Sequence, residues 1–209
     1  MGKAANSSIS LKQIHVTDNF WNKYVHLVKD VIIPYQWDIL NDKLEDVETS
    51  HCIENFKIAA GEKGEFQGAV FQDTDVAKWL EAVGFVLNYE RDEKLEELAD
   101  ETIELIGRAQ QLDGYLNTYF TIKEPDGRWS NLMEGHELYT AGHMIEAAVA
   151  YYEATGKRRF LEIVSKFADL VCQTFGPEEG KIHGYPGHQE IELALVKLYR
   201  VTREKKYLD

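Results

Sequence analysis

The chain has 209 residues and a mass of 24.0 kDa, which is enough for one domain with a substantial hydrophobic core. Its formal net charge of -13 repels nucleic-acid phosphates and anionic lipid, so neither nucleic acid nor a membrane is an expected partner. No apolar run approaches the roughly 20 residues of a membrane-spanning helix. The N-terminus lacks a secretory signal pattern, so we expect a cytoplasmic location, with residues 1–14 flexible.

The sequence contains only two cysteines, Cys52 and Cys172, and they lie far apart. Neither a disulfide framework nor a thiolate metal cluster can be built from them. We expect both to serve as small hydrophobic residues of the core.

Apolar residues recur with a helical period along most of the chain. A first helix is expected over 20–41, with a disturbance at Pro34, because proline removes an internal hydrogen bond. The later helices are expected over 75–89, on apolar stripes within 95–106, 138–152 and 160–171, and from Ile191 onward. No segment alternates with period two for long enough to predict a strand. Short pairings within 64–71 and 115–123 stay open.

The expected helices form pairs joined by similar short polar turns, which lie at 88–95, 152–161 and 199–208. Each pair leaves an apolar flank uncovered, so neighbouring pairs must stack into a solenoid or a closed α/α ring. The expected fold class is therefore all-α, with about three helical hairpins in this chain. Tyr207–Asp209 fit the opening of a further helix, so we expect the chain to be truncated at its C-terminal end. The uncovered edge predicts a homodimer or poor solubility.

Four histidines fall in two places where ligands commonly bind. His136 and His143 are spaced i, i+7 on one helix, with His136 at the rim and His143 expected to pack or cap. His183 and His188 bracket a glycine-rich turn in a long loop, and rim loops on helical scaffolds often carry binding groups. A zinc site there is less favoured, because no metal-binding spacing supports it. A neutral imidazole offers one donor and one acceptor, which suits sugar hydroxyls.

Carboxylates supply the other candidate groups. Asp73, Thr74 or Asp75 can cap the helix over 75–89, or a carboxylate there can bind sugar hydroxyls beside the flat ring of Trp79. A catalytic pair for glycoside hydrolysis depends on a separation that sequence does not supply. The candidates for it are Asp73, Asp75, Asp113, Glu134, Glu137, Glu190 and Glu192.

Several stretches together resemble the bacterial β-L-arabinofuranosidases of glycoside hydrolase family 127. They are VIIPYQW at 31–37, FQDTDVAKWLE at 71–81, AQQLDGYL at 109–116, GHELY at 135–139, GHMIEAAVAY at 142–151, and the segment from Phe175 to Ala194. The likeness covers nearly the whole chain after about residue 15. The combination is specific, although DGYL alone recurs across many α/α toroid enzymes.

The resemblance implies that residues 1–209 are the N-terminal part of one (α/α)6 toroid catalytic domain, followed by β-sandwich domains. Such enzymes release L-arabinofuranose from plant-type glycans with retention, using a zinc-bound cysteine as nucleophile and a glutamate as acid/base. Those residues belong to the later half of the family's toroid. The resemblance therefore implies zinc for the complete enzyme, and no catalytic residue or metal ligand in this chain, which we expect to be inactive alone.

Substrate binding is the role that the resemblance leaves to this chain. The family's substrate-contacting histidines match His136 and His188, and we expect Asp75 to bind the arabinofuranoside with them.

Two other classes compete with this interpretation. One is another α/α toroid sugar enzyme, either a uronide hydrolase or lyase or a sugar epimerase with histidines as acid and base. The other is a non-enzymatic helical-repeat binding module, with an extended concave surface and no affinity for monosaccharides.

Overall fold

Helices account for the regular structure of the computed structural model, which describes residues 9–209. In chain order they are α1 Trp21–Leu27, α2 Ile33–Leu40, α3 Cys52–Ala59, α4 Asp73–Tyr89, α5 Glu93–Ala109, α6 Thr118–Ile122, α7 Glu137–Thr155, α8 Arg159–Thr174 and α9 Ile191–Thr202. The expected all-α class is confirmed over this range. The pairings left open at 64–71 and 115–123 do not form strands: the first segment is a loop and the second contains α6.

At the two ends of the described chain lie short 3-10 turns. The flexibility expected at the N-terminus lies partly outside the described residues, which begin at residue 9, and Leu11–Gln13 form a short 3-10 turn. Near the C-terminal end, where a further helix is expected to open at Tyr207, a 3-10 turn occupies Lys205–Tyr207. No helix within residues 9–209 combines the length and the apolar character that crossing a bilayer requires.

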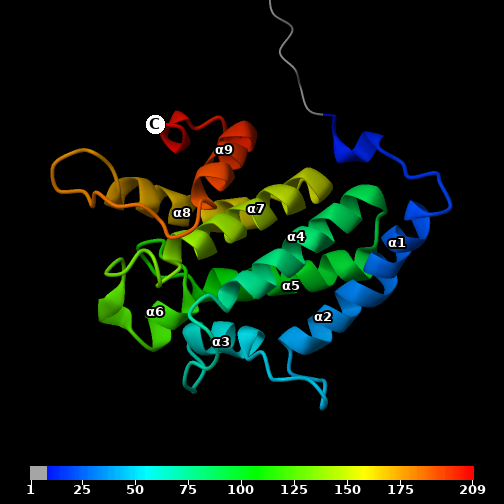
Figure 1. Cartoon of the computed structure of the whole chain (residues 1–209), viewed down its shortest axis with the longest axis horizontal. Coiled ribbons are helices and arrows are strands. Elements are labelled where there is room, and N and C mark those ends of the chain that lie inside the picture. Colours follow the sequence, from blue (N-terminus) through cyan, green and yellow to red (C-terminus); the bar gives the residue numbers. More distant parts are fainter. Residues whose placement is uncertain (1–8) are drawn as a thin grey trace, which may run out of the picture.

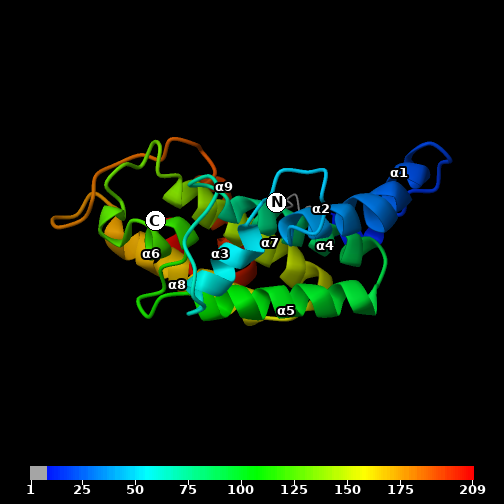
Figure 2. The same ribbon diagram turned by 90° about the horizontal axis from the view of Figure 1, so that it is seen from below.

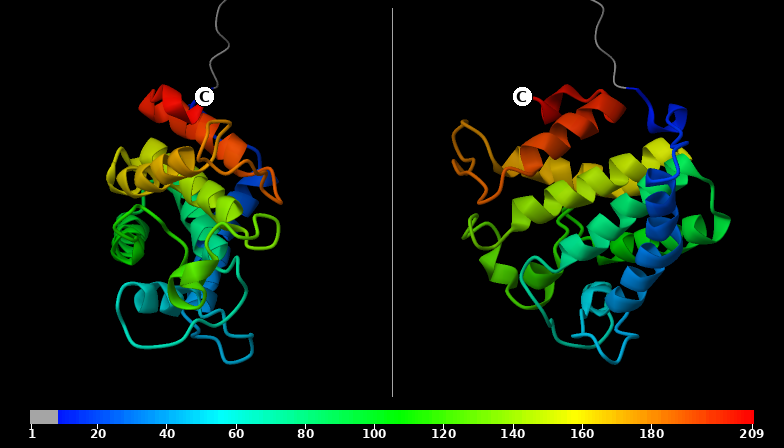
Figure 3. Two further views of the ribbon diagram at one scale, coloured as in Figure 1. Left: turned by 90° about the vertical axis from the view of Figure 1, so that its left-hand side faces the viewer. Right: turned by 45° about the vertical axis from the view of Figure 1, so that its right-hand side comes forward.

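The helices lie in two layers (Figures 1 and 2). In one layer α4 packs between α2 and α7, and α7 also contacts α9. In the other layer α5 contacts α8. The hairpins α4–α5 and α7–α8 each pass from one layer to the other, and Figure 3 shows α5 and α8 together on one side. The stacked hairpins expected from the sequence are therefore present.

Helices α4, α7 and α9 of the first layer run in the same direction, whereas α2 runs opposite to α4, since Lys29 just before α2 pairs with Glu90 just after α4. Lys78 of α4 contacts Tyr139 of α7 near their beginnings, and Gly84 meets Ala150 further along. The start of α9, at Glu190, meets Gly142 of α7, and Lys197 further along α9 pairs with Glu146 further along α7. The N-terminal ends of these three helices consequently meet at one end of the layer, together with the loops that precede them.

The crossing of α4 and α7 is close because α4 has a glycine there. A Cβ atom built on Gly84 would lie 2.9 Å from the carbonyl carbon of Ala150 and 2.9 Å from the nitrogen of Tyr151. Both are backbone atoms, so no side-chain rotation can relieve the contact. This glycine sets how near the two helices lie.

Trp79 fixes α4 against α2. Its ring is almost fully buried, lies 4.5 Å from the ring of Trp37 between centroids, and donates an Nε1 hydrogen bond of 3.1 Å to the carbonyl of Ile33. A buried indole with a satisfied N–H contributes apolar burial without the cost of an unpaired donor.

The disturbance expected at Pro34 takes the form of a widened turn. A π-helical turn over Val28–Ile32 joins α1 to α2, and Pro34 lies in the first turn of α2. Proline has no N–H, and its ring collides with the carbonyl four residues earlier in a regular helix. A π turn inserted just before it lets the chain continue as a helix without that collision.

Helix α4 begins two residues earlier than expected, and the predicted carboxylate or hydroxyl cap is wrong. Gln72 is the N-cap residue and makes no side-chain capping bond. Asp73 is buried and instead accepts hydrogen bonds from the backbone nitrogen of Thr118 at 2.7 Å and from its Oγ1 at 2.5 Å. Burial raises the pKa of Asp73 to about 6, although both bonds from Thr118 oppose the rise. Asp73 thus joins α4 to α6.

Replacing Asp73 with alanine should destabilise the fold by about 3 kcal/mol, because two buried donors of Thr118 lose their acceptor. Urea unfolding followed by circular dichroism measures the change. Asp75→Ala is the matched control, since Asp75 lies in the same helical turn but is exposed, and it should change stability little. Equal losses from the two variants would contradict the account.

Candidate active site

Three histidines surround Tyr139 at the end of the layer where α4, α7 and α9 begin. Ring centroids of Tyr139 lie 5.7 Å from His136, 4.9 Å from His188 and 4.5 Å from His143. The Nε2 atoms of His136 and His188 are 3.2 Å apart. Two residues from separate loops, both expected to bind substrate, therefore lie side by side.

His136 is held in a fixed orientation. It is the N-cap residue of α7 with a φ of 55°, a conformation that costs free energy in residues other than glycine and is often found at functional sites. Its Nδ1 lies 2.6 Å from the carbonyl oxygen of Glu134. A carbonyl can only accept, so Nδ1 carries the proton, and a neutral His136 presents its Nε2 lone pair toward His188.

The imidazole pair has an aromatic neighbour and a cation close by. The ring of Phe71 lies 5.2 Å from that of His136 between centroids. Lys78 donates to the hydroxyl of Tyr139 at 3.2 Å and to Oγ1 of Thr74 at 3.1 Å. Flat apolar rings beside hydrogen-bonding groups are what a sugar ring with hydroxyls requires.

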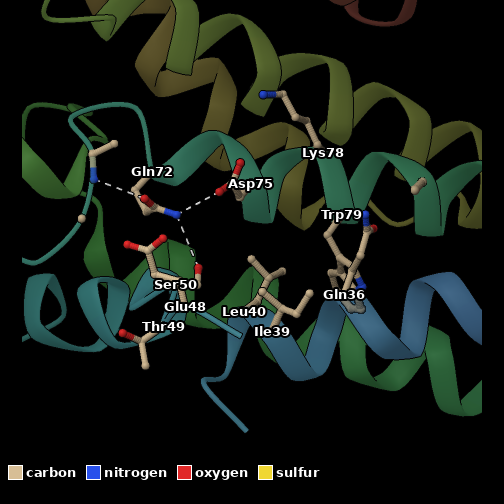
Figure 4. Close-up of a pocket in the computed structure, with 13 residues that line it drawn as sticks. Gln36, Ile39, Leu40, Glu48, Thr49, Ser50, Gln72, Asp75, Lys78 and Trp79 are labelled. Carbon is tan, nitrogen blue, oxygen red and sulfur yellow. Dashed lines mark hydrogen bonds between the residues drawn. The ribbon is translucent and has the colours of Figure 1, made fainter. Parts of the chain in front are cut away.

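A cavity of about 820 Å³ opens beside this cluster, between α2 and α4 (Figure 4). Asp75, Gln72 and Lys78 line it, with Trp79 and the apolar end of α2. Gln72 donates from Nε2 to Asp75 at 2.8 Å and to the hydroxyl of Ser50 at 3.4 Å. Although Asp75 reaches solvent, its partial desolvation in the cavity raises the pKa of its carboxyl, and the charge of the nearby Lys78 only partly opposes the rise.

The structure separates the three expected site residues into two neighbouring groups. Asp75 lies in the cavity, whereas His136 and His188 do not line it. Lys78 connects the groups, since it lines the cavity and bonds to Tyr139.

Tyr139 and Lys78 were not among the residues predicted for the site. Tyr139 follows His136 by three residues and Lys78 follows Asp75 by three, a spacing that places side chains on one face of a helix. This helical spacing could have indicated that Tyr139 and Lys78 lie beside the predicted site residues.

Other candidate carboxylates have structural partners. Glu137 is buried and accepts from the hydroxyl of Tyr115 at 2.5 Å and from the backbone nitrogen of Trp129 at 2.7 Å. Asp113 forms an ion pair with Arg128 at 3.1 Å. Glu137 and Asp113 are thus engaged within the fold, whereas Asp75 lines the cavity.

A second polar cluster lies behind Tyr139, between α7 and α9. His143 Nδ1 is 3.5 Å from a carboxylate oxygen of Glu190, and the ammonium of Lys197 contacts Glu146. Burial and, to a smaller extent, the charge of Lys78 lower the pKa of His143 to about 4 against the opposing charge of Glu146, so the ring is neutral at pH 7. His143, Glu146 and Glu190 have ligand atoms within 4.8 Å of one another, but Lys197 already supplies a cation at this position.

The zinc implied by the family resemblance does not fit the part of the chain that the structure describes. Cys52 is fully buried and donates to the carbonyl of Gln72 at 3.2 Å, and burial raises its pKa well above the usual value. Cys172 is only half-buried, and burial raises its pKa as well. Neither thiol joins a group of potential metal ligands between residues 9 and 209, and neither do His183 and His188.

Comparisons with known proteins agree on one family. Residues 13–209 match the family described as "Beta-L-arabinofuranosidase, GH127 catalytic domain". The chain is 46% identical over 212 aligned residues to the non-reducing end β-L-arabinofuranosidase of Bifidobacterium longum subsp. longum, and the match covers 93% of this chain and 32% of that protein.

Solved structures give the same result. A GH127 β-L-arabinofuranosidase from Geobacillus stearothermophilus T6 superposes with a TM-score of 0.92 at 62% identity, covering 94% of this chain and 31% of that chain. The GH127 β-arabinofuranosidase BT3674 gives 0.88 at 38% identity, covering 96% and 32%. The chain thus spans about a third of the length of these relatives.

Proposed function

The chain belongs to the GH127 β-L-arabinofuranosidase family, and from this membership we propose that it contributes one wall of the sugar site of a retaining hydrolase that releases L-arabinofuranose from plant-type glycans. In this proposal residues 1–209 form the N-terminal part of an (α/α)6 toroid. His136, His188 and Asp75 bind the substrate. The catalytic cysteine, the zinc and the acid/base glutamate come from outside this chain.

One observation carries the proposal: two imidazoles from distant loops meet at 3.2 Å on a rigid helical scaffold. Nε2 of His136 accepts, because its Nδ1 donates to Glu134. A sugar hydroxyl that replaces the contact between the two rings can accept from Nε2 of His188 and donate to Nε2 of His136. The hydroxyl of Tyr139 and the ammonium of Lys78 add further hydrogen-bonding groups beside them.

The meeting of His136 and His188 also distinguishes between the proposed sugar site and the two competing classes of protein. A helical-repeat module gives no reason for two imidazoles to meet at one point next to a cavity, so the pair favours a sugar site over an extended binding surface. Family membership favours an arabinofuranosidase over a uronide hydrolase, a lyase or an epimerase.

The homodimer expected from the sequence stays a prediction. Its surface would be the apolar face around α1, where Phe20, Trp21, Tyr24 and Val31 are exposed.

The test of the proposed function uses the chain alone and a chimera. In the chimera, this chain replaces the matching third of the Geobacillus stearothermophilus enzyme, to which it is 62% identical. With p-nitrophenyl β-L-arabinofuranoside we expect turnover by the chimera and none above background by the chain alone. Proton NMR of the first-formed sugar should show the β-anomer, as retention requires. Activity of the chain alone, or a folded but inactive chimera, would overturn the proposal.

A further inference from the structure

His188 belongs to a connection with little regular structure of its own. The segment between α8 and α9 contains one isolated bridge, Phe175 to Ile182, and His188 lies two residues before the N-cap of α9. A side chain on such a loop keeps a fixed position only if the loop is fastened close to it.

Two glycines bring the backbone on either side of His188 against its neighbours. A Cβ atom on Gly187 would lie 2.5 Å from the carbonyl oxygen of Met133, and the Gly187 nitrogen donates to the carbonyl of Leu132 at 3.2 Å. A Cβ atom on Gly142 of α7 would lie 2.6 Å from Cγ of Glu190. The loop is therefore in tight contact with the preceding rim loop and with α7.

Glu190 makes the polar contacts that hold this loop against α7. Its nitrogen donates to the carbonyl of His188 at 3.0 Å, so its backbone is tied directly to the histidine. Its carboxyl faces His143 and Glu146 of α7, with Glu81 of α4 nearby. Lys197 of α9 pairs with Glu146 from the other side.

The carboxyl of Glu190 keeps its proton to a higher pH than an ordinary glutamate does. Burial, the bond to Glu146 and the charges of Glu146 and Glu81 together raise the pKa of Glu190 to about 7, while Lys197 opposes the rise. The pKa of Glu146 is lowered, because its bonds with Glu190 and Lys197 outweigh its burial. In its protonated form the carboxyl of Glu190 can donate to the carboxylate of Glu146, which Lys197 also contacts.

We propose that Glu190 is a positioning residue of the sugar site: its side chain, with Cγ packed against Gly142 and the carboxyl facing His143 and Glu146, holds His188 beside His136. The functional part of this inference rests on the proposed sugar site, but the positioning itself does not. A neutral donor is sufficient for the role, so glutamine can replace Glu190 and alanine cannot.

The first experiment needs no sugar. In the full chain with labelled histidines, a nuclear Overhauser contact between the ring protons of His136 and His188 reports their proximity, since their centroids are 5.0 Å apart. We expect Glu190→Ala to abolish this contact and Glu190→Gln to retain it. Glu192→Ala is the matched control, because it removes an exposed carboxylate from the same helical turn and should retain the contact.

A further variant keeps the test decisive if Glu190→Ala does not fold. Gly142→Ala leaves the carboxyl in place but introduces a methyl group where Glu190 lies, so it should also abolish the contact. Persistence of the ring contact in Glu190→Ala or in Gly142→Ala would overturn the proposal. So would its loss in Glu190→Gln, because that would show a need for the ionised carboxylate or for a cation bound to it.

The second experiment uses the chimera. Misplacing a binding group by about 1 Å can cost about 100-fold in rate, so Glu190→Ala should lower kcat/KM by about that factor while Glu190→Gln stays close to the parent. A ring contact that responds as expected in a chimera without turnover would leave the positioning role standing and remove the proposed function. An active chimera whose Glu190→Ala variant keeps its kcat/KM would leave the proposed function standing and remove the positioning role of Glu190.

Discussion

Gly84→Leu is expected to prevent folding of the chain, and Gly84→Ala to lower the free energy of unfolding by about 2 kcal/mol. The added Cβ would lie 2.9 Å from two backbone atoms of α7, so α4 and α7 must separate along their main contact. Alanine gains about 1 kcal/mol of helix propensity over glycine, and the clash outweighs that gain. A leucine side chain cannot be accommodated there, and domains of this size are stable by only about 5–15 kcal/mol.

Gly107→Ala is the matched control for this prediction. Gly107 also lies inside a helix, α5, but an added Cβ would meet the ends of two side chains, those of Arg159 and Ile163. The Arg159 guanidinium is flexible and can move away, so helix propensity should dominate and the variant should be neutral or slightly stabilised. Urea unfolding of both alanine variants measures the difference. A Gly84→Ala protein as stable as Gly107→Ala would contradict the packing described for α4 and α7.

Replacing either imidazole of the pair should reduce the activity of the chimera by about 100-fold or more in kcat/KM, an effect typical of a lost polar contact that strengthens in the transition state. His136→Ala and His188→Ala remove hydrogen-bonding groups at a single point, so the double variant should lose little more than either single variant. Steady-state kinetics with p-nitrophenyl β-L-arabinofuranoside measures these losses.

His26→Ala is the control for this experiment, because His26 lies on α1 with its side chain 50% exposed and near Asp30. It should leave kcat/KM unchanged. Fully additive losses from His136→Ala and His188→Ala would show that the two rings act at separate places, which contradicts a shared site.

Much of the helical architecture could be predicted from the sequence because the apolar stripes are long. The helices with the clearest stripes, α4, α5, α7 and α8, were all expected within a few residues of their observed bounds. Helix α3 was not predicted. It has only eight residues and buries Cys52, Ile53, Asn55 and Phe56, a group too short to show a period. The five-residue helix α6 was missed for the same reason.

The start of α4 shows what local pattern cannot supply. A sequence of Asp73, Thr74 and Asp75 before an apolar stripe is typical of a cap, yet the acceptor of Asp73 is used by Thr118, which lies 45 residues later. Only the folded chain brings these two together. Burial then raises the pKa of the same carboxylate, which no local pattern indicates.

The candidate site was predicted in part. The pairing of His136 and His188 was expected from the family resemblance, and the rim position of both loops followed from the helical hairpins. Tyr139 and Lys78 were missed, although their helical spacing was visible. The contact of Glu190 with Glu146 depends on the crossing of α7 and α9, and therefore on tertiary packing.

The most direct measurement is a titration of the chain with L-arabinose, followed through the imidazole resonances of its seven histidines. If His136 and His188 together form one wall of a sugar site, their signals should shift with one common dissociation constant, while the exposed His26 stays unchanged. Shifts of neither ring, or shifts of His136 and His188 with different dissociation constants, would contradict that site.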